Sequence, residues 1–299
     1  MADAAVYAEH AEAPRRAPTT VPQIDYMNPA GAPALYSPDS VAWRVYRNPL
    51  TVMIGGICAA SLEMAEPRVR TGVWEHSIFP VDPLMRIRRT GVTTMATIYA
   101  PAKAAERLIA SATRMHGRVN GQTPDGQAFR ALDEELLIWV YATVDYGFME
   151  AYAAYGGKLT DAEKSAFYRE SVVSARLFGA ENKPASLEEQ RALFNRFVPL
   201  LEAHPILFDY FRITMGVGKL PFGLRWLQKL IVRAGVDLMP RAVHEKLGLG
   251  AEWRLTGLER GFLKLLGGVM SRVPIRSAPP VQASIRMGLP PDHLYRRRS

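Results

Sequence analysis

Residues 101–119 read PAKAAERLIASATRMHGRV, and their apolar side chains recur at the spacing of an amphipathic helix. Apolar positions three or four residues apart fall on one face of a helix, whereas the basic positions lie elsewhere around it. This face consists of Ala105, Leu108, Ile109, Ala112, His116 and Val119. The stretch therefore predicts a helix whose histidine, His116, points inward.

A turn-rich gap and a second helix follow. The dipeptide NG at 120–121 and the tripeptide PDG at 124–126 favour turns, so we expect a short ordered loop or a hairpin there. Asp133, Glu134 and Glu135 then supply the negative charge typical of a first helical turn. The apolar stripe behind them contains Leu136, Leu137, Val140, Tyr141, Val144 and Phe148. We expect this long helix to cross the core.

Further helices are marked along the rest of the chain. TDAE at 160–163, SLEE at 186–189 and TGLE at 256–259 match the capping box that begins many helices. Basic residues interrupt the apolar run 220–236 at helical intervals, which predicts another core helix. The helix that starts near Leu258 is interpreted as a packed core helix, with contact to a membrane surface as the alternative. Strand signals are sparse, so the predicted fold class is all-α around one core.

The predicted organisation is one helical domain over residues 41–290. Residues 1–40 are rich in Ala and Pro without apolar periodicity and are expected to form a flexible N-terminal arm. Residues 291–299 form a basic C-terminal tail. We find no apolar run of about 18 residues, the minimum for a membrane-spanning helix, and expect the protein to be cytoplasmic.

Composition excludes several kinds of site. Cys58 is the only cysteine, so this chain alone holds no disulfide, thiolate zinc site or iron–sulfur cluster. The motifs of phosphate-binding loops, serine hydrolases and zincins are missing. The net charge of +8 indicates a basic surface or an anionic partner. Haem propionates, anionic lipids and nucleic acid remain open as that partner.

Two groups of residues are candidates for chemistry. If residues 83–99 are helical, Arg86, Arg89 and Thr90 share one face and can bind carboxylates or another anion, although a solvated basic turn is the alternative. His116 is either a hydrogen-bonded core histidine or a ligand. His76, beside Glu75, is the second candidate for a ligand or proton shuttle.

The other titratable positions receive plainer interpretations. His10 and His293 lie in the two ends of the chain, and His204 and His244 are expected to be surface or cap residues. Glu170 occupies an apolar stripe and therefore needs a partner, for which we expect an arginine. Its carboxylate belongs either to a structural ion pair or to the surroundings of a site.

A succession of short motifs resembles the catalytic domain shared by rubber oxygenases (latex clearing proteins) and the fungal ER-bound oxygenase of mycophenolic acid biosynthesis. The resemblance covers residues 40–290 and is strongest over 66–179. Its motifs are EHS at 75–77, DP at 82–83, RIRRT at 86–90, RMHGRVNG at 114–121, LIWVYAT at 137–143, YRE at 168–170 and LFG at 177–179.

The resemblance implies an all-helical, haem b-dependent oxygenase or peroxidase-like oxidoreductase with His116 as the iron ligand. It implies that Arg86 and Thr90 lie near the haem, and Arg89 stands where a relative can carry an iron-ligating lysine. Because a guanidinium stays protonated, we expect no lysine-closed state here. Arg86 and Arg89 would hold propionates or polarise dioxygen or peroxide, with Glu75 or Glu66 as base.

An apolar substrate such as an isoprenoid, lipid or polyketide is expected, with dioxygen or peroxide as co-substrate. The chain differs from its relatives at Glu66 and at Tyr141, where they carry histidine. A haem- or lipid-binding protein of the same fold without catalysis is therefore the first alternative. A nucleic-acid binder is suggested by charge alone, and we do not expect one because no groove-reading element is evident.

Overall fold

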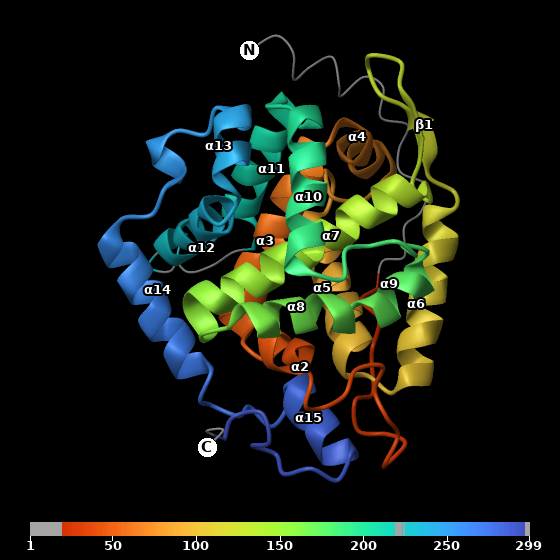
Figure 1. Cartoon of the computed structure of the whole chain (residues 1–299), viewed down its shortest axis with the longest axis vertical. Helices are drawn as coiled ribbons and strands as arrows, with labels where there is room; N and C mark the ends of the chain where they lie inside the picture. The colour runs from red at the N-terminus through yellow and green to blue at the C-terminus, as the bar shows by residue number, and fades with distance from the viewer. Residues whose placement is uncertain (1–19, 219–222, 224, 297–299) are drawn as a thin grey trace.

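The computed structural model describes residues 20–218, 223 and 225–296 and confirms the all-α prediction (Figure 1). Its helices are α2 (Val41–Tyr46), α3 (Pro49–Ala65), α4 (Pro67–His76), α5 (Pro83–Tyr99), α6 (Ala102–His116), α7 (Glu134–Ala151), α8 (Asp161–Glu170), α9 (Val172–Phe178), α10 (Leu187–Phe197), α11 (Pro205–Gly216), α12 (Arg225–Asp237), α13 (Arg241–Leu247), α14 (Gly257–Met270) and α15 (Pro279–Arg286). Shorter helical segments are the π-helix η1 (Tyr152–Gly156) and the 3-10 turns η2 (Val198–Leu200) and η4 (Ala251–Trp253).

Helices α3 and α7 pack against each other at the centre of the molecule, where Figure 1 shows them crossing. Two glycines allow their backbones to approach. A Cβ atom at Gly55 would lie 2.7 Å from the Cα of Phe148, and one at Gly147 would lie 3.0 Å from the backbone nitrogen of Ala59. The predicted core helix is thus α7. It packs closely on α3 because Gly55 and Gly147 have no side chains at their contact.

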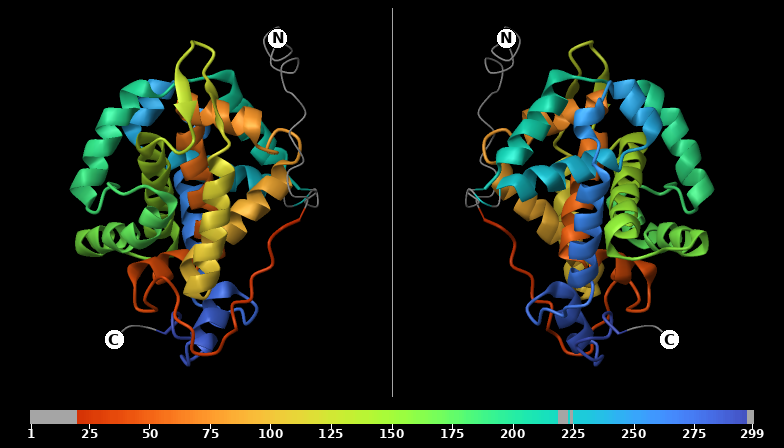
Figure 2. Two further views of the ribbon diagram at one scale, coloured as in Figure 1. Left: turned by 90° about the vertical axis from the view of Figure 1, so that its right-hand side faces the viewer. Right: turned by 90° about the vertical axis from the view of Figure 1, so that its left-hand side faces the viewer.

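Helices α4, α5 and α6 stand on one side of this central pair, and the remaining helices cover the others (Figure 2). The gap predicted after α6 contains a hairpin of β1 (Asn120–Gln122) and β2 (Ala128–Arg130), as expected. Phe129 of this hairpin packs against Gly72 of α4, where an added Cβ would lie 3.2 Å from its ring. The hairpin therefore covers the end of α4.

The predicted helix starts are confirmed by their caps. Thr160 and Thr256 form complete capping boxes with Glu163 and Glu259. Ser186 accepts a hydrogen bond from the backbone nitrogen of Glu189. The Glu189 carboxylate accepts a hydrogen bond from the backbone nitrogen of Ala185, not from that of Ser186. The predicted helix over 220–236 is observed as α12, and residues 219–222 and 224 lie outside the described residues.

The interpretation of the last long helix as a core helix is wrong. Helix α14 buries only Leu263 and Gly267, and most of its apolar side chains are exposed. Its inner face is specified by polar contacts: the Asn48 amide donates to the Gly267 carbonyl at 2.8 Å and to the Ser271 hydroxyl at 2.7 Å. These contacts fix the rotation of the helix on the core.

Residues 20–40 lie across the surface without a helix, and the rest of the predicted arm, with His10, is outside the described residues. Tyr26 and Tyr36 of this segment are buried. Arg286 of α15 donates to the carbonyls of Tyr26, Ala32 and Tyr99, at 2.7 to 2.9 Å, and so ties the segment to the core.

One buried ion pair joins α7 to the loop after α9. Lys183 lies 2.7 Å from the carboxylate of Asp145, and both side chains are almost fully buried. Lys183 also donates to the hydroxyl of Ser171, which in turn donates to Asp145. The three groups satisfy one another, as buried charges must.

Within the described residues, no single helix has the length and apolar character needed to cross a membrane. The bent pair of α3 and α4, with 105° between its members, passes that test by length and composition alone.

Candidate functional site

Arg86 and Thr90 lie one turn apart on α5, on the shared face that their spacing predicts. Asp82 begins this helix by accepting a hydrogen bond from the Met85 backbone at 3.0 Å, and Pro83 occupies its first position. The Thr90 hydroxyl donates to the Arg86 carbonyl at 2.9 Å, and the Arg86 guanidinium donates to the Thr90 hydroxyl. Thr90 therefore orients the Arg86 side chain.

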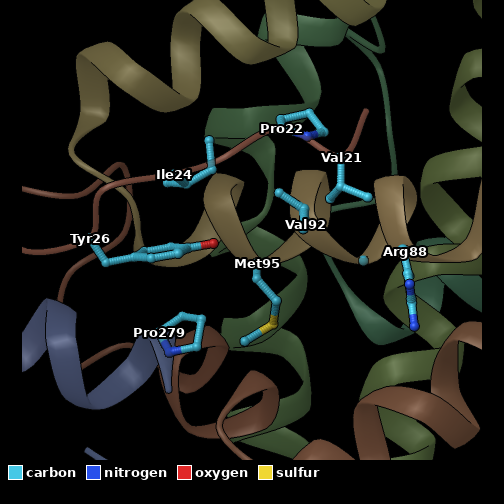
Figure 3. Close-up of a pocket in the computed structure, with 9 residues that line it drawn as sticks. Val21, Pro22, Ile24, Tyr26, Arg88, Val92, Met95 and Pro279 are labelled. Carbon is cyan, nitrogen blue, oxygen red and sulfur yellow. The ribbon is translucent and has the colours of Figure 1, made fainter. Parts of the chain in front are cut away.

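Only the last four residues of α5, 96–99, are buried in the core. The opposite face of α5, over residues 88–95, borders an apolar groove of about 450 Å³, where Val92 lies near Val21 and Met95 near Pro279 (Figure 3). The groove and the Arg86 side chain thus belong to different faces of one helix.

His116 is the last residue of α6 and is partly buried. Burial, and next the positive charge of Arg86, lower the pKa of its imidazole below the ordinary value. Its ring makes no hydrogen bond or ion pair with another residue in the described part of the chain. His116 is therefore a neutral imidazole near pH 7, which is the form that ligates metals.

Glu63, near the carboxyl end of α3, is the carboxylate whose charge influences the pKa of Arg86. Burial raises its pKa to about 7, against the opposing effects of the Arg86 charge and of a 3.4 Å hydrogen bond from Thr143. Sequence reasoning missed this residue. A signal was available, because Glu63 is the only charged residue in a 17-residue apolar helix.

The two glutamates proposed from the sequence, Glu66 and Glu75, lie outside the group of residues around Arg86. Glu66 is buried and caps α4, accepting from the Val69 backbone at 2.8 Å and from Arg68 at 2.6 Å. Glu75 is exposed near the end of α4, where His76 is exposed beside it. Neither glutamate is among the groups that shift the pKa of Arg86 or of His116.

The groups around Arg86 come from separate layers of the fold. Helices α5 and α6 pack on each other, but neither packs closely on α3. Burial nevertheless lowers the pKa of Arg86, with Glu63 and Tyr210 opposing this and Arg89 adding to it. Glu63, Arg86 and His116 are desolvated yet keep some accessible surface. We name these three residues, which come from α3, α5 and α6, the interlayer cluster.

The charge balance of this cluster is positive. Arg86 makes no ion pair within the described residues, and its neighbours include Arg89, a neutral His116 and a Glu63 that is half protonated near pH 7. Guanidinium groups present planar pairs of donors that match carboxylates. The site thus favours an anionic group beside Arg86.

The donor set also restricts how a metal could be held. Among the described residues, no group of three or more His, Cys, Asp or Glu side chains is placed to bind a metal ion. A macrocycle brings its own ring ligands, so it would require only His116 from the chain. A haem fits both requirements, since it brings four ring nitrogens and two anionic propionates.

Other predicted positions have structural roles. The expected arginine partner of Glu170 is wrong: its carboxylate accepts from the backbone nitrogens of Val41 and Ala42 at 3.0 and 2.9 Å, where α2 begins. His204 caps α11, as expected. His244 is buried rather than a surface residue, with its Nε2 2.9 Å from the Val236 carbonyl.

A comparison with protein families gives one match. Residues 43–272, well over half of the chain, match the family described as "ER-bound oxygenase mpaB/B'/Rubber oxygenase, catalytic domain". The chain belongs to this family. The matched region of the rubber oxygenase domain contains the whole interlayer cluster, and the resemblance inferred from the short motifs is confirmed. Comparisons with curated proteins and with solved structures found no match.

Membership in the rubber oxygenase family supports an oxygenase-type activity in general terms. The family region also includes α14 and η1, so the exposed apolar side chains of α14 belong to the catalytic domain itself.

Proposed function

We propose that this protein is a haem b-dependent oxygenase that binds iron through His116 and acts on an apolar substrate. The observation that carries the proposal is that His116 has a pKa lowered by burial and by Arg86 and no hydrogen-bond partner for its ring among the described residues. A histidine held neutral at the end of a helix is ready to ligate iron without first losing a proton.

Arg86 and Arg89 are proposed to bind the propionates. Both belong to α5 at a spacing of three residues, and Arg86 is desolvated and makes no ion pair within the described part of the chain. Thr90 holds the Arg86 guanidinium in place. When bound, haem would supply the redox chemistry that amino-acid side chains lack.

Glu63 is proposed as the residue that holds and releases a proton during the reaction. A group whose pKa lies near 7 exists in both protonation states at neutral pH, which is the condition for efficient acid–base catalysis. Arg86 lies close enough to favour the ionised form. Glu63 therefore replaces Glu75 and Glu66 as our candidate for the base.

The substrate is proposed to be apolar, such as an isoprenoid, a lipid or a polyketide. Glu63 lies between Leu62 and Met64, two fully buried members of the main apolar core, which also contains Phe79 and Tyr210. The family description also supports an apolar substrate, because rubber, which gives the rubber oxygenases their name, is an apolar polymer. Dioxygen or peroxide would be the co-substrate.

The first test is the absorption spectrum of protein expressed with a haem precursor. We expect a Soret band at near-stoichiometric haem in the wild type and its loss in His116→Ala. His76→Ala is the matched control, because His76 is the second candidate ligand and is exposed. Normal haem loading in His116→Ala, or loss of haem in His76→Ala alone, would refute the assignment.

A second comparison tests the base. With apolar alkenes and lipids as substrates, Glu63→Gln should lower turnover far more than Glu75→Gln while both variants keep the Soret band. Equal effects of the two substitutions would remove Glu63 from the mechanism and leave the haem assignment intact.

A further inference from the structure

Helix α14 presents an apolar stripe to solvent instead of to the core. Leu258, Phe262, Leu265 and Val269 are 89, 40, 69 and 48% exposed, and their spacings of four, three and four residues place them on one face. Monomeric proteins rarely expose contiguous apolar surface of this extent without a partner.

The exposed apolar surface continues beyond both ends of the stripe. Trp226 of α12 is 53% exposed, and its ring centroid lies 5.4 Å from that of Phe262. After the helix, Val273 and Ile275 are 52 and 51% exposed. We name these seven residues the α14 face. Helix α14 is about 21 Å long at 1.5 Å per residue. It runs along one side of the molecule (Figure 2).

The α14 face cannot turn inward to bury its side chains. On the inner side of the helix, Gly267 packs on the backbone of Tyr155, and a Cβ atom there would collide with it. Asn48 holds the Gly267 carbonyl and the Ser271 hydroxyl, and Ser271 donates to the Gly156 carbonyl at 2.9 Å. The exposed orientation is thus fixed by the fold.

The charges on α14 after its first turn, and in the segment that follows, are positive. From residue 260 to residue 291 the sequence has five Lys or Arg residues and no Asp or Glu. Lys264, Arg272 and Arg276 of this set are exposed and make no ion pair within the described residues. Glu259, the one acid of α14, is paired with Arg233. Lys264 lies on α14 and Arg272 and Arg276 follow it, and this basic rim beside an apolar surface complements anionic lipid headgroups.

We propose that the α14 face docks on the surface of an anionic phospholipid membrane. The apolar side chains would enter the boundary between headgroups and acyl chains, with Trp226 at the interface, where tryptophan is favoured. Lys264, Arg272 and Arg276 would contact the phosphates. A second copy of this chain is the less favourable occupant, because pairing two α14 faces would bring their basic rims together.

The test is co-sedimentation of the full chain with vesicles. We expect binding to vesicles that contain phosphatidylserine, much weaker binding to pure phosphatidylcholine, and a decrease at high salt. Leu258→Glu with Leu265→Glu should reduce the partition coefficient at least about tenfold, since both leucines would be buried in the bilayer. The control is Val81→Glu with Leu200→Glu, which changes the charge equally at residues 73 and 46% exposed elsewhere.

Three results would overturn the proposal: no sedimentation of the wild type, equal binding to both kinds of vesicle, or an equal loss in the two double variants. A dimer in light scattering that the α14 variant dissociates, without vesicle binding, would instead assign the face to a second copy. Far-UV circular dichroism of both variants establishes that they are folded. Haem loading is measured separately, so failure of this proposal does not bear on His116.

Discussion

Replacing Glu63 with Gln should remove a pH-dependent contribution to stability. Burial raises the Glu63 pKa from 4.5 to about 7 in the fold. Because the folded protein then binds this proton more tightly than the unfolded chain does, the contribution of Glu63 to stability is fully present below pH 4.5 and is lost as the pH rises through 7. Glutamine cannot titrate, so this part of the decrease should be missing in the variant.

The magnitude follows from the shift. A rise of about 2.5 pKa units corresponds to about 3 kcal/mol of unfolding free energy, at about 1.4 kcal/mol per unit. The value is an upper limit, since the side chain keeps some accessible surface and solvent screens its charge. We therefore expect wild type to lose up to about 3 kcal/mol more than Glu63→Gln between about pH 4.5 and pH 8.

The assay is urea unfolding of the haem-free protein at several pH values in that interval, followed by circular dichroism. Taking the difference between wild type and variant cancels the titration of His116 and of the other groups that both proteins share. Glu75→Gln is the control, since its parent side chain is exposed. Parallel stability curves for wild type and Glu63→Gln would refute the assignment of a raised pKa to Glu63.

Three further substitutions test other parts of the structure. Lys183→Met leaves the buried Asp145 carboxylate without its cation and should cost about 3–5 kcal/mol of unfolding free energy in urea titrations, whereas replacing both partners by apolar residues should restore most of it. Gly267→Ala drives a methyl group into the Tyr155 backbone, so a loss of about 1–3 kcal/mol is expected, and an unchanged melting temperature would contradict the packing of α14. Glu170→Gln removes the negative charge at the start of α2 and should cost about 1 kcal/mol, seen as a lower denaturation midpoint.

Periodicity and capping chemistry predicted most of the helices because both act over a few neighbouring residues. The stripe of 101–119, the acidic start of α7 and the Thr160 and Thr256 boxes are all local patterns, and each is present in the structure. The burial of α14 could not be predicted in the same way. An amphipathic pattern states which residues share a face, but not whether that face meets the core or solvent.

One contact of the candidate site could be predicted from local sequence patterns in the same way. Arg86 and Thr90 are one turn apart, so their contact follows from helix geometry. Their proximity to His116 depends on how α5 packs on α6, and Glu63 joins them from α3, which is distant in sequence. Glu66 and Glu75 were predicted from the resemblance to the family, whereas the influence of Glu63 on Arg86 depends on the tertiary fold.

The interlayer cluster contains one permanently charged side chain, Arg86, and one side chain that can exchange a proton near neutral pH, Glu63. Arg86 remains cationic throughout the physiological range, and among the described residues Glu63 is the carboxylate whose charge opposes the lowering of its pKa. In the proposed function, Arg86 would hold the anionic group while Glu63 gains or loses a proton, so anion binding and proton exchange would be carried by different side chains. A lysine in place of Arg89 would weaken this separation, since lysine shifts its pKa readily when desolvated.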